Sequence, residues 1–494
     1  MPRAMASLLA LITGVAVSAG AQAQEFGTLV SPGTQDAAQL SMAQTIQPVC
    51  EGLDAARAQG ELNSTQITLN EVCRNMVFNN GTDNGQGVSN PLPGEITGYL
   101  QPQDELNAFT QRINGEETQA TQQQVGSVQA IQESNIGARI EAIRAGLASP
   151  GLSFAGLSLD DGENVLQAGY DDGETVLPAG YDEDLLVGQG GDLDAPVWDR
   201  LGVFVTGGGK FGDKSDSSEV TGYDFWSVGL TGGADYRVRD DLVFGAAIGY
   251  SYYDVDFNDN DSNISGQDLD SNSVSLSLFG TFFPGGAAEG LFVDGLATVG
   301  WSWIDMSRRI VIEPGPGSDG PPIDEEANGD TDALFFGFAG NVGYDFNVQQ
   351  FRITPVARVR FIRADIDNYE ESGAGAVNLE FGSQDATSLT THAGVEIGYA
   401  FSTGFGVIEP SIRGEYIHEF LNDDDGVDVG YVSDPNNFTL ETVTEDPDRN
   451  YGVVGASVTG TFSAGWSSFL DFETVLGYSS YDIYALRAGV RKEF

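Results

Sequence analysis

The chain ends in a segment whose side chains alternate between apolar and charged. In the last thirteen residues, Asp482–Phe494, one face carries Tyr484, Leu486, Ala488 and Val490. The opposite face carries Arg487, Arg491 and Glu493. A repeat of two residues is the period of a β-strand, because successive side chains point to opposite faces. The segment predicts a strand with lipid on one side and water on the other, but a soluble edge strand alternates too, so the segments upstream must decide.

The same alternation recurs from Trp198 to the end of the chain. We expect twelve strands, centred near Phe204, Leu230, Ile248, Leu276, Val299, Phe338, Val359, Val395, Ile412, Val454, Phe472 and Leu486. In the eleventh, Leu470 and Phe472 oppose Asp471 and Glu473. A soluble sandwich whose apolar faces share a core would give the same pattern. Alternation alone therefore does not place the strands in a membrane.

The lengths of the connections favour a membrane barrel. Tight connections lie at residues 239–241, 347–350, 402–404 and 463–465. Long acidic stretches lie at residues 254–270, 307–332, 367–387 and 421–450. Short and long connections alternate along the chain, so the short turns share one end of the sheet. That asymmetry is expected of an outer-membrane barrel, which has short periplasmic turns and longer external loops.

The amino terminus predicts export. It contains Arg3, an apolar run from about Ala6 to Val17, and the small residues Ala21 and Ala23. This order is typical of a secretory signal, here residues 1–23. No later stretch approaches 18 uninterrupted apolar residues, which excludes a membrane-spanning helix. A chain without such a helix can span a bilayer only as a closed barrel, because every backbone polar group must be hydrogen-bonded there.

The net charge of -51, from 73 acidic and 22 basic residues, argues against nucleic acid or an anionic membrane surface as a partner. An acidic, solvated surface is typical of an exported protein. Cofactor and metal sites are not expected either, because the only histidines, His392 and His418, lie far from both cysteines in the sequence.

Residues 24–150 predict a small helical region. Two short helices are expected between about Leu40 and Val77, each with one cysteine and separated by a capping signal at Asn63. In an oxidising compartment Cys50 and Cys73 form a disulfide most simply, which stabilises the hairpin by roughly 3 kcal/mol in the chain-entropy model.

A long amphipathic helix is expected from Glu116 to Ala148. The partner of its apolar stripe stays open: the helical hairpin, a second copy, or the interior of a pore. Residues 151–197 form an acidic linker containing two adjacent eleven-residue repeats, Asp160–Tyr170 and Asp171–Tyr181. Since about fifty residues separate the helix from the barrel, plugging the pore would require the chain to double back, or a different segment such as Asp184–Val197.

Residues 198–494 resemble the translocator barrel of the autotransporter family, the type V secretion proteins of the outer membrane. The similarity is carried by Arg200–Gly209, Gly233–Tyr250 and the terminal Ala488–Phe494. The resemblance implies a twelve-stranded, up-and-down antiparallel barrel that follows a small helical region. It also implies a carboxy-terminal signal for the barrel-assembly machinery, formed by Tyr484, Leu486, Ala488, Val490 and Phe494. Lys492 departs from the apolar residue usual in that pattern, although a lysine near lipid headgroups can extend toward water.

Charged side chains on the inward parity of the strands are the candidate functional residues. They are Arg358, Arg360, Glu396, Arg413, Glu415, Asp471, Glu473, Arg487 and Arg491. They form either a charge ladder along a conduit or paired charges that keep the lumen wet. His392 shares their parity and His418 faces lipid, so a catalytic pair is not expected, and no nucleophile-elbow motif occurs. Calcium binding is an alternative role for the acidic external loops, including Asp423–Gly426, whereas the Asp-Asp-Gly-Glu runs of the linker repeat do not have the spacing of a known calcium loop.

The sequence thus predicts an exported outer-membrane barrel that anchors, or carries across the membrane, a short helical region, and that is not an enzyme. Its expected partners are outer-membrane lipid, the general secretion machinery and the barrel-assembly machinery. The alternative is a stand-alone channel or structural envelope protein with a periplasmic helical domain. An enzyme built into the barrel is a third reading, to be tested with His392→Ala.

Overall fold

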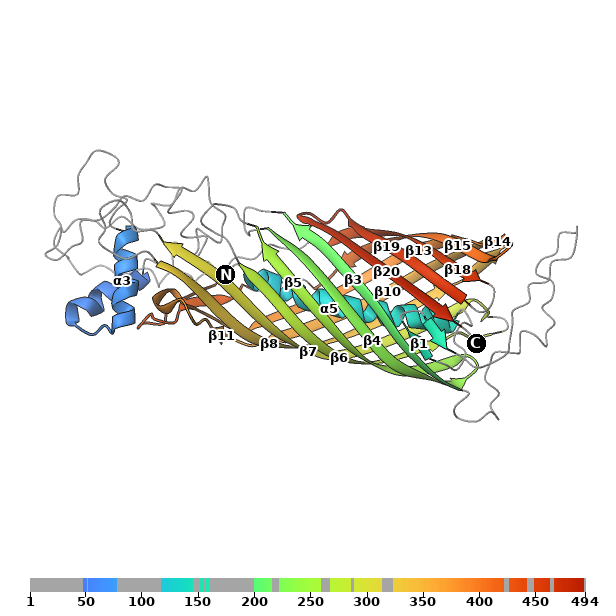
Figure 1. Cartoon of the computed structure of the whole chain (residues 1–494), viewed down its shortest axis with the longest axis horizontal. Helices are drawn as coiled ribbons and strands as arrows, with labels where there is room; N and C mark the ends of the chain where they lie inside the picture. The colour runs from blue at the N-terminus through green and yellow to red at the C-terminus, as the bar shows by residue number, and fades with distance from the viewer. Residues whose placement is uncertain are drawn as a thin grey trace, which may run out of the picture.

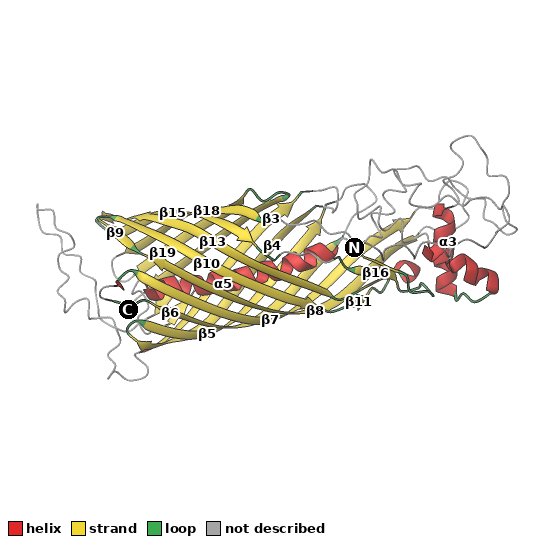
Figure 2. Cartoon of the chain, turned by 180° about the vertical axis from the view of Figure 1, so that it is seen from behind, coloured by secondary structure: helices red, strands yellow, loops and turns green. Residues whose placement is uncertain are grey.

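The alternating segments fold into one closed sheet. The computed structural model describes residues 48–50, 52–77, 117–144, 152–154, 157–159, 200–215, 222–258, 267–285, 288–312, 323–421, 426–441, 448–462 and 466–492. The signal, most of the linker, the calcium candidate Asp423–Asp425 and Phe494 lie outside these residues. Figures 1 and 2 show an elongated barrel whose strands tilt steeply to its axis.

Twelve antiparallel strands make the barrel, as predicted, and each contains one of the twelve expected centres. They are β3 (Leu201–Lys214), β4 (Tyr223–Arg239), β5 (Leu242–Phe257), β6 (Asp268–Phe282), β7 (Leu291–Ile312), β8 (Ile323–Tyr344), β10 (Phe351–Ile366), β13 (Gln384–Tyr399), β15 (Gly406–Glu419), β18 (Asn450–Phe462), β19 (Trp466–Leu476) and β20 (Tyr481–Lys492). Pairing of β20 with β3, from Tyr481 opposite Lys214 to Leu486 opposite Gly209, closes the cylinder. Two short strands, β9 (Phe346–Val348) and β14 (Phe401–Thr403), pair with β10 and β15 at their turns.

The two faces of the sheet differ as the alternation predicts. On the outside the strands expose large apolar side chains, for example Ile248 at 67% and Leu230 at 53%. On the inside the same strands bury small polar ones, such as Thr231 and Ser277, both 0% exposed. An apolar outer face around a polar lumen is the arrangement of a barrel in lipid.

The two ends of the barrel are unequal. β3 begins, and β20 ends, at the end where the short turns lie, which we call the short-turn end. At the opposite, long-loop end, β7 and β8 run on as a hairpin of 22 residues each. The stretch 307–332, expected as a loop, is therefore strand on both sides of residues 313–322. Its period-two pattern was obscured in the sequence by the many acidic residues.

The long loops form a second, smaller sheet. It consists of β11 (Tyr369–Glu370), β12 (Leu379–Phe381), β16 (Asp428–Tyr431) and β17 (Thr439–Glu441), with the short helix η3 (Gly375–Val377). We call these strands and η3 the cap. A buried ion pair ties the cap to the β7–β8 extension: the Arg308 guanidinium donates to both Glu371 carboxylate oxygens, at 2.5 and 2.6 Å. Two predicted acidic loops thus contribute buried apolar side chains, including Leu379 and Phe381, to the hydrophobic cluster at the long-loop end.

The helical hairpin lies at the long-loop end (Figure 1). It consists of helical residues 48–50 and 52–59 and of α3 (Ser64–Val77). Asn63 caps α3, since its side-chain oxygen accepts from the Gln66 backbone N–H at 2.9 Å while Gln66 accepts from the Asn63 N–H. Cys50 is disulfide-bonded, and the sequence contains one other cysteine, Cys73. No helix in the described ranges is both long and apolar enough to cross a membrane.

The long helix, α5 (Glu117–Arg144), runs inside the barrel along its axis (Figure 2). After it, β1 (Leu152–Phe154) and β2 (Leu157–Leu159) form an antiparallel pair. β1 pairs in parallel with the start of β3, with Leu152 opposite Val203. The expected linker 151–197 therefore contains a short hairpin that extends the edge of β3 at the short-turn end.

Candidate functional site

The lumen with α5 inside it is the candidate site. The amino-terminal part of α5 lies toward the long-loop end, where the Thr121 hydroxyl donates to the Met306 sulfur at 3.9 Å. Its carboxy-terminal part lies at the short-turn end, where Arg139 pairs with Asp235. β3 also begins at the short-turn end, the end at which α5 ends. The interior of the pore, one of the three alternatives left open, is therefore the partner of the apolar stripe of α5, and Asp184–Val197 lies outside the described residues.

One wall of the lumen presents short hydroxyl side chains to α5, which packs against it. Its glutamine and asparagine side chains bind hydroxyl groups of β4 to β7. Gln124 donates to Ser271 at 2.6 Å, Gln132 donates to Ser277 at 3.1 Å, and Asn135 donates to Thr231 at 3.0 Å. The amide nitrogens of these three side chains donate to short hydroxyl side chains, which leave room for a helix. The sequence revealed an apolar stripe on α5, but its polar side is buried as well.

Apolar contacts secure both ends of α5. Toward the short-turn end, Ile136, Ile140 and Ile143 pack with Phe204 and Phe279. Toward the long-loop end, Val125 and Val128 belong to a buried cluster that includes aromatic side chains of β4 and β5, namely Tyr223, Phe225 and Tyr253. The helix is thus held by hydrophobic contacts above and below a polar middle.

Glycines in the wall make space for the helix. A Cβ atom at Gly249 would lie 2.0 Å from the Gln132 side-chain oxygen, and one at Gly337 would lie 1.6 Å from the Gln129 amide nitrogen. At Gly229 it would lie 2.5 Å from Ile131. A larger residue at these positions would displace the α5 side chains that lie over them, so these glycines are part of the site. Nothing in the sequence distinguishes them among its 65 glycines.

Ion pairs join α5 to both walls. Arg139, on the short-turn side, donates to Asp235 at 2.7 Å, and both side chains are buried. On the opposite wall, Glu133 lies 2.7 Å from Arg360 of β10. Arg487 of β20 also donates to the Ser134 hydroxyl of α5 at 2.5 Å. These contacts fix how the helix is rotated about its axis as well as how deep it sits.

The charged wall of the lumen borders a cavity of about 960 Å³ beside α5. Eight of the nine sequence-predicted inward charges line it, namely Arg358, Arg360, Glu396, Arg413, Glu415, Asp471, Glu473 and Arg487. The Arg491 side chain lies outside the described residues. Strands β10 to β20 therefore carry the charged half of the lumen, and β3 to β7 the helix-binding half.

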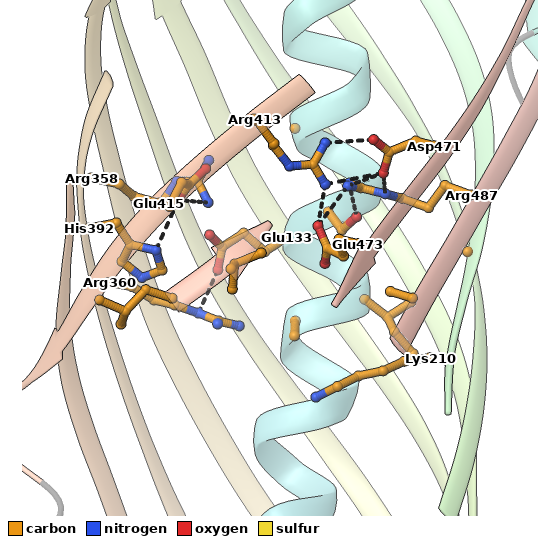
Figure 3. A pocket seen from close by; sticks show the side chains of 18 of the residues that line it. Glu133, Lys210, Arg358, Arg360, His392, Arg413, Glu415, Asp471, Glu473 and Arg487 are labelled. Atoms are coloured by element: carbon orange, nitrogen blue, oxygen red, sulfur yellow. Dashed lines mark hydrogen bonds and ion pairs between the residues drawn. The ribbon is translucent and has the colours of Figure 1, made fainter. Parts of the chain in front are cut away.

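Most of these charges are paired in clusters (Figure 3). Arg413 donates to Asp471 at 2.5 Å and also to Glu473, and Arg487 pairs with the same two carboxylates. Nearer the short turns, Arg352 lies between Glu396 and Glu409, at 2.6 and 3.0 Å. Because opposite charges are paired, this wall of the lumen is neutralised and does not carry a continuous row of charges of one sign.

His392 belongs to a third cluster. Its Nδ1 lies 3.2 Å from Glu415 and its Nε2 lies 3.1 Å from the Thr390 hydroxyl, while Arg358 lies 3.8 Å from Glu415. His418, in contrast, stacks edge-on against Phe420 on the outer face. The two histidines face opposite ways, as the strand parity predicts.

Some site residues were missed by sequence reasoning. Lys210 reaches from β3 to the Ser127 hydroxyl of α5 at 3.3 Å, and Arg352 anchors the cluster near the turns. Strand parity could have identified both. The expected assembly signal is only partly described: Tyr484 stacks on Phe211 and Phe472 on the outer face. Among the described residues, no group of three or more His, Cys, Asp or Glu side chains is arranged to hold a metal ion.

A closed twelve-stranded barrel with an axial helix, an apolar outer face and a charged lumen defines an outer-membrane-type β-barrel. The family model for the autotransporter beta-domain matches residues 203–473, more than half of the 494 residues. The chain therefore belongs to the autotransporter family.

Curated relatives agree with this family. The chain is 26% identical over 270 residues to "Esterase EstA" of Pseudomonas aeruginosa, which covers 53% of this chain and 38% of that protein. It is 28% identical over 210 residues to "Outer membrane protein B" of Rickettsia japonica, covering 42% of this chain and 12% of that protein. The chain thus spans well under two thirds of the length of these relatives.

Two solved autotransporter barrels match the chain at low sequence identity. The translocator domain of the autotransporter NalP from Neisseria meningitidis matches with a TM-score of 0.44 and 17% identity, over 61% of this chain and 89% of that one. The beta domain of the Bordetella autotransporter BrkA matches with a TM-score of 0.41 and 16% identity, over 60% of this chain and 100% of that one.

Proposed function

We propose that the barrel anchors its own amino-terminal helical region and carries that region to the outer surface of the cell. The observation that supports this most directly is the path of the chain. The helical hairpin lies at the long-loop end, α5 occupies the lumen, and β3 starts at the short-turn end. If the long loops face outward, as in bacterial outer-membrane barrels, the hairpin is outside the cell.

Export by the general secretion machinery, with residues 1–23 as the signal, and recognition by the barrel-assembly machinery belong to the same proposal. The ion pairs of Arg139 and Glu133 would hold α5 in the lumen once the hairpin has crossed. On this view the lumenal charges serve the passage and retention of a polypeptide rather than catalysis.

Protease shaving of intact cells tests the display. An epitope tag inserted near Asn84 is expected to be lost on protease treatment while the barrel stays protected. Survival of the tag until the outer membrane is breached would place the hairpin in the periplasm and contradict the proposal.

The charged cavity beside α5 supports a second candidate, a channel or structural envelope protein. This cavity of about 960 Å³ is lined by the ion-paired residues of the wall, which water can reach. A purified barrel that conducts ions with α5 in place, together with a tag near Asn84 that only a breached membrane exposes, would favour this candidate.

We propose no catalytic role for the chain, although one curated relative is named an esterase. The share of that relative which the chain spans, 38%, leaves most of it unmatched. Loss of an ester-hydrolysing activity on His392→Ala, with the barrel still assembled, would overturn this view.

A further inference from the structure

The cap is built to hold the helical hairpin. Val49 and Leu53, next to the disulfide-bonded Cys50, are both 0% exposed, and Leu69 of α3 is 1% exposed. An isolated hairpin of some thirty residues cannot bury so many side chains by itself. Their neighbours are the buried side chains of the cap.

One apolar cluster runs from the hairpin into the cap. Its hairpin members are Val49, Cys50, Leu53, Leu69 and Val72. Its cap members include Ala374, Ala376, Val377, Leu379 and Tyr431. The same cluster continues through Met306 and Ile310 of the β7–β8 extension to Val125 of α5. The hairpin therefore has no hydrophobic core that is separate from that of the barrel's long-loop end.

The fit is closest at Gly52. A Cβ atom there would lie 2.2 Å from the Asn436 side-chain amide nitrogen and 3.9 Å from the Phe438 ring. Both of these residues follow β16 in the chain. Gly52 therefore lets the first helix approach the loop that joins β16 to β17. Three residues later, the Ala55 side chain is exposed and does not belong to this contact.

From these contacts we infer that the barrel's own long loops are the binding partner of the helical hairpin, and that the hairpin stays bound to the cap when its covalent link to α5 is cut. This inference rests on the proposed surface display. After such a cut, non-covalent contacts with the cap would keep the hairpin on the cell surface, and it would not be released into the medium. The segment that covers the cap's apolar surface is thus part of the same chain.

The test uses intact cells that carry the full-length chain. A recognition sequence for a site-specific protease is inserted near Asn84, between α3 and α5, and an epitope tag is placed after Ala23. After cleavage, the tag is measured in the cell pellet and in the medium. We expect at least nine tenths of the cleaved fragment to remain with the cells, and to be released by urea.

Two matched variants separate docking from nonspecific adhesion. Gly52→Leu pushes the first helix away from Asn436 and is expected to raise the released fraction about tenfold, whereas Ala55→Leu is expected to change nothing. Adding Asn436→Ala to Gly52→Leu makes room for the new side chain and should restore part of the retention. A merely misfolded hairpin would not be rescued in this way.

The outcomes distinguish the inference from the proposal beneath it. If the protease cannot cut intact cells, the display fails and the inference fails with it. If it cuts and the fragment appears in the medium with the native sequence, the display stands and the docking is refuted. If the fragment is retained equally by the native chain and by Gly52→Leu, adhesion replaces docking as the explanation.

Discussion

How much an ion pair contributes to the stability of this barrel depends on how far its two side chains are removed from water. The Arg139 and Asp235 side chains are only 5% and 7% exposed, whereas Arg239 and Asp241, at a short turn, are 57% and 34% exposed. An exposed ion pair contributes little, while removing one partner of a buried pair leaves an uncompensated charge.

A substitution at each arginine tests this difference. Arg139→Met should destabilise the folded barrel by about 3–5 kcal/mol, because Asp235 loses its partner in a buried site. Arg239→Met should cost less than about 1 kcal/mol. Urea unfolding in detergent micelles measures both. Equal effects of the two variants would mean that water reaches Asp235 freely.

Glu380 of the cap gives a pH-dependent prediction. Burial, followed by the neighbouring Glu370 and Asp434, raises the pKa of the Glu380 carboxyl above its ordinary value. The folded cap therefore prefers the neutral form. The cap is most stable at a pH below the ordinary glutamate pKa. Its stability falls as the pH rises from there through the raised pKa of Glu380.

Glu380→Gln should remove this loss, because Glu370 lies directly opposite it in the sheet. At neutral pH the gain should be up to about 1 kcal/mol. Hydrogen exchange of residues 369–381 at pH 4 and pH 7 measures it, once each rate is divided by the intrinsic rate of an unprotected amide at the same pH, with Glu325→Gln on the exposed part of β8 as the control. A native cap whose amides are better protected at pH 7 than at pH 4, on this corrected scale, would contradict the sign.

At the level of single elements, α5 and the strands around it are matched in length. Its 28 residues span about 42 Å at the α-helical rise, which exceeds the roughly 30 Å of a bilayer's hydrocarbon core. The helix can therefore reach from one mouth of the barrel to the other. The position of α5 in the lumen depends on glycines of the barrel wall, which have no side chain.

Gly249→Leu tests this dependence. A side chain at Gly249 would occupy the place of the Gln132 amide, so the Gln132 side chain must move and lose its hydrogen bond to Ser277, at a cost of about 1–3 kcal/mol. Hydrogen exchange of the α5 amides should accelerate. Gly295→Leu is the control, because a Cβ there meets nothing within 4 Å. Unchanged exchange in Gly249→Leu would show that α5 does not lie against β5.

For the whole molecule, α5 decides how open the lumen is. With the helix present, the space beside it is a cavity of about 960 Å³. Deletion of residues 117–144 should enlarge the path for ions and raise the single-channel conductance in planar bilayers several-fold. Deletion of the repeat at residues 160–181 should leave the conductance unchanged. A conductance that is the same with and without α5 would mean that other residues close the pore.

Much of this architecture can be predicted from local patterns. Strand number, lipid-facing side chains such as Leu230 and Leu470, and lumenal charges such as Arg413 and Asp471 all follow from period-two alternation. The extension of β7 and β8 cannot be predicted in this way. Residues 307–332 are acidic and contain Pro and Gly, which are typical of loops, yet residues 307–312 and 323–332 are strand and belong to the paired ends of β7 and β8.

The sequence by itself determined the barrel, because alternation along each strand is a local property and the short turns leave one way to pair the strands. It also determined that α5 and the hairpin are helices. Only the tertiary structure decided that α5 lies in the lumen, seated on Gly249 and Gly337, and that Leu53 packs against the cap. The physical reason is that these contacts join residues more than a hundred positions apart, and burial of a helix's polar side depends on hydroxyl groups that a distant segment supplies.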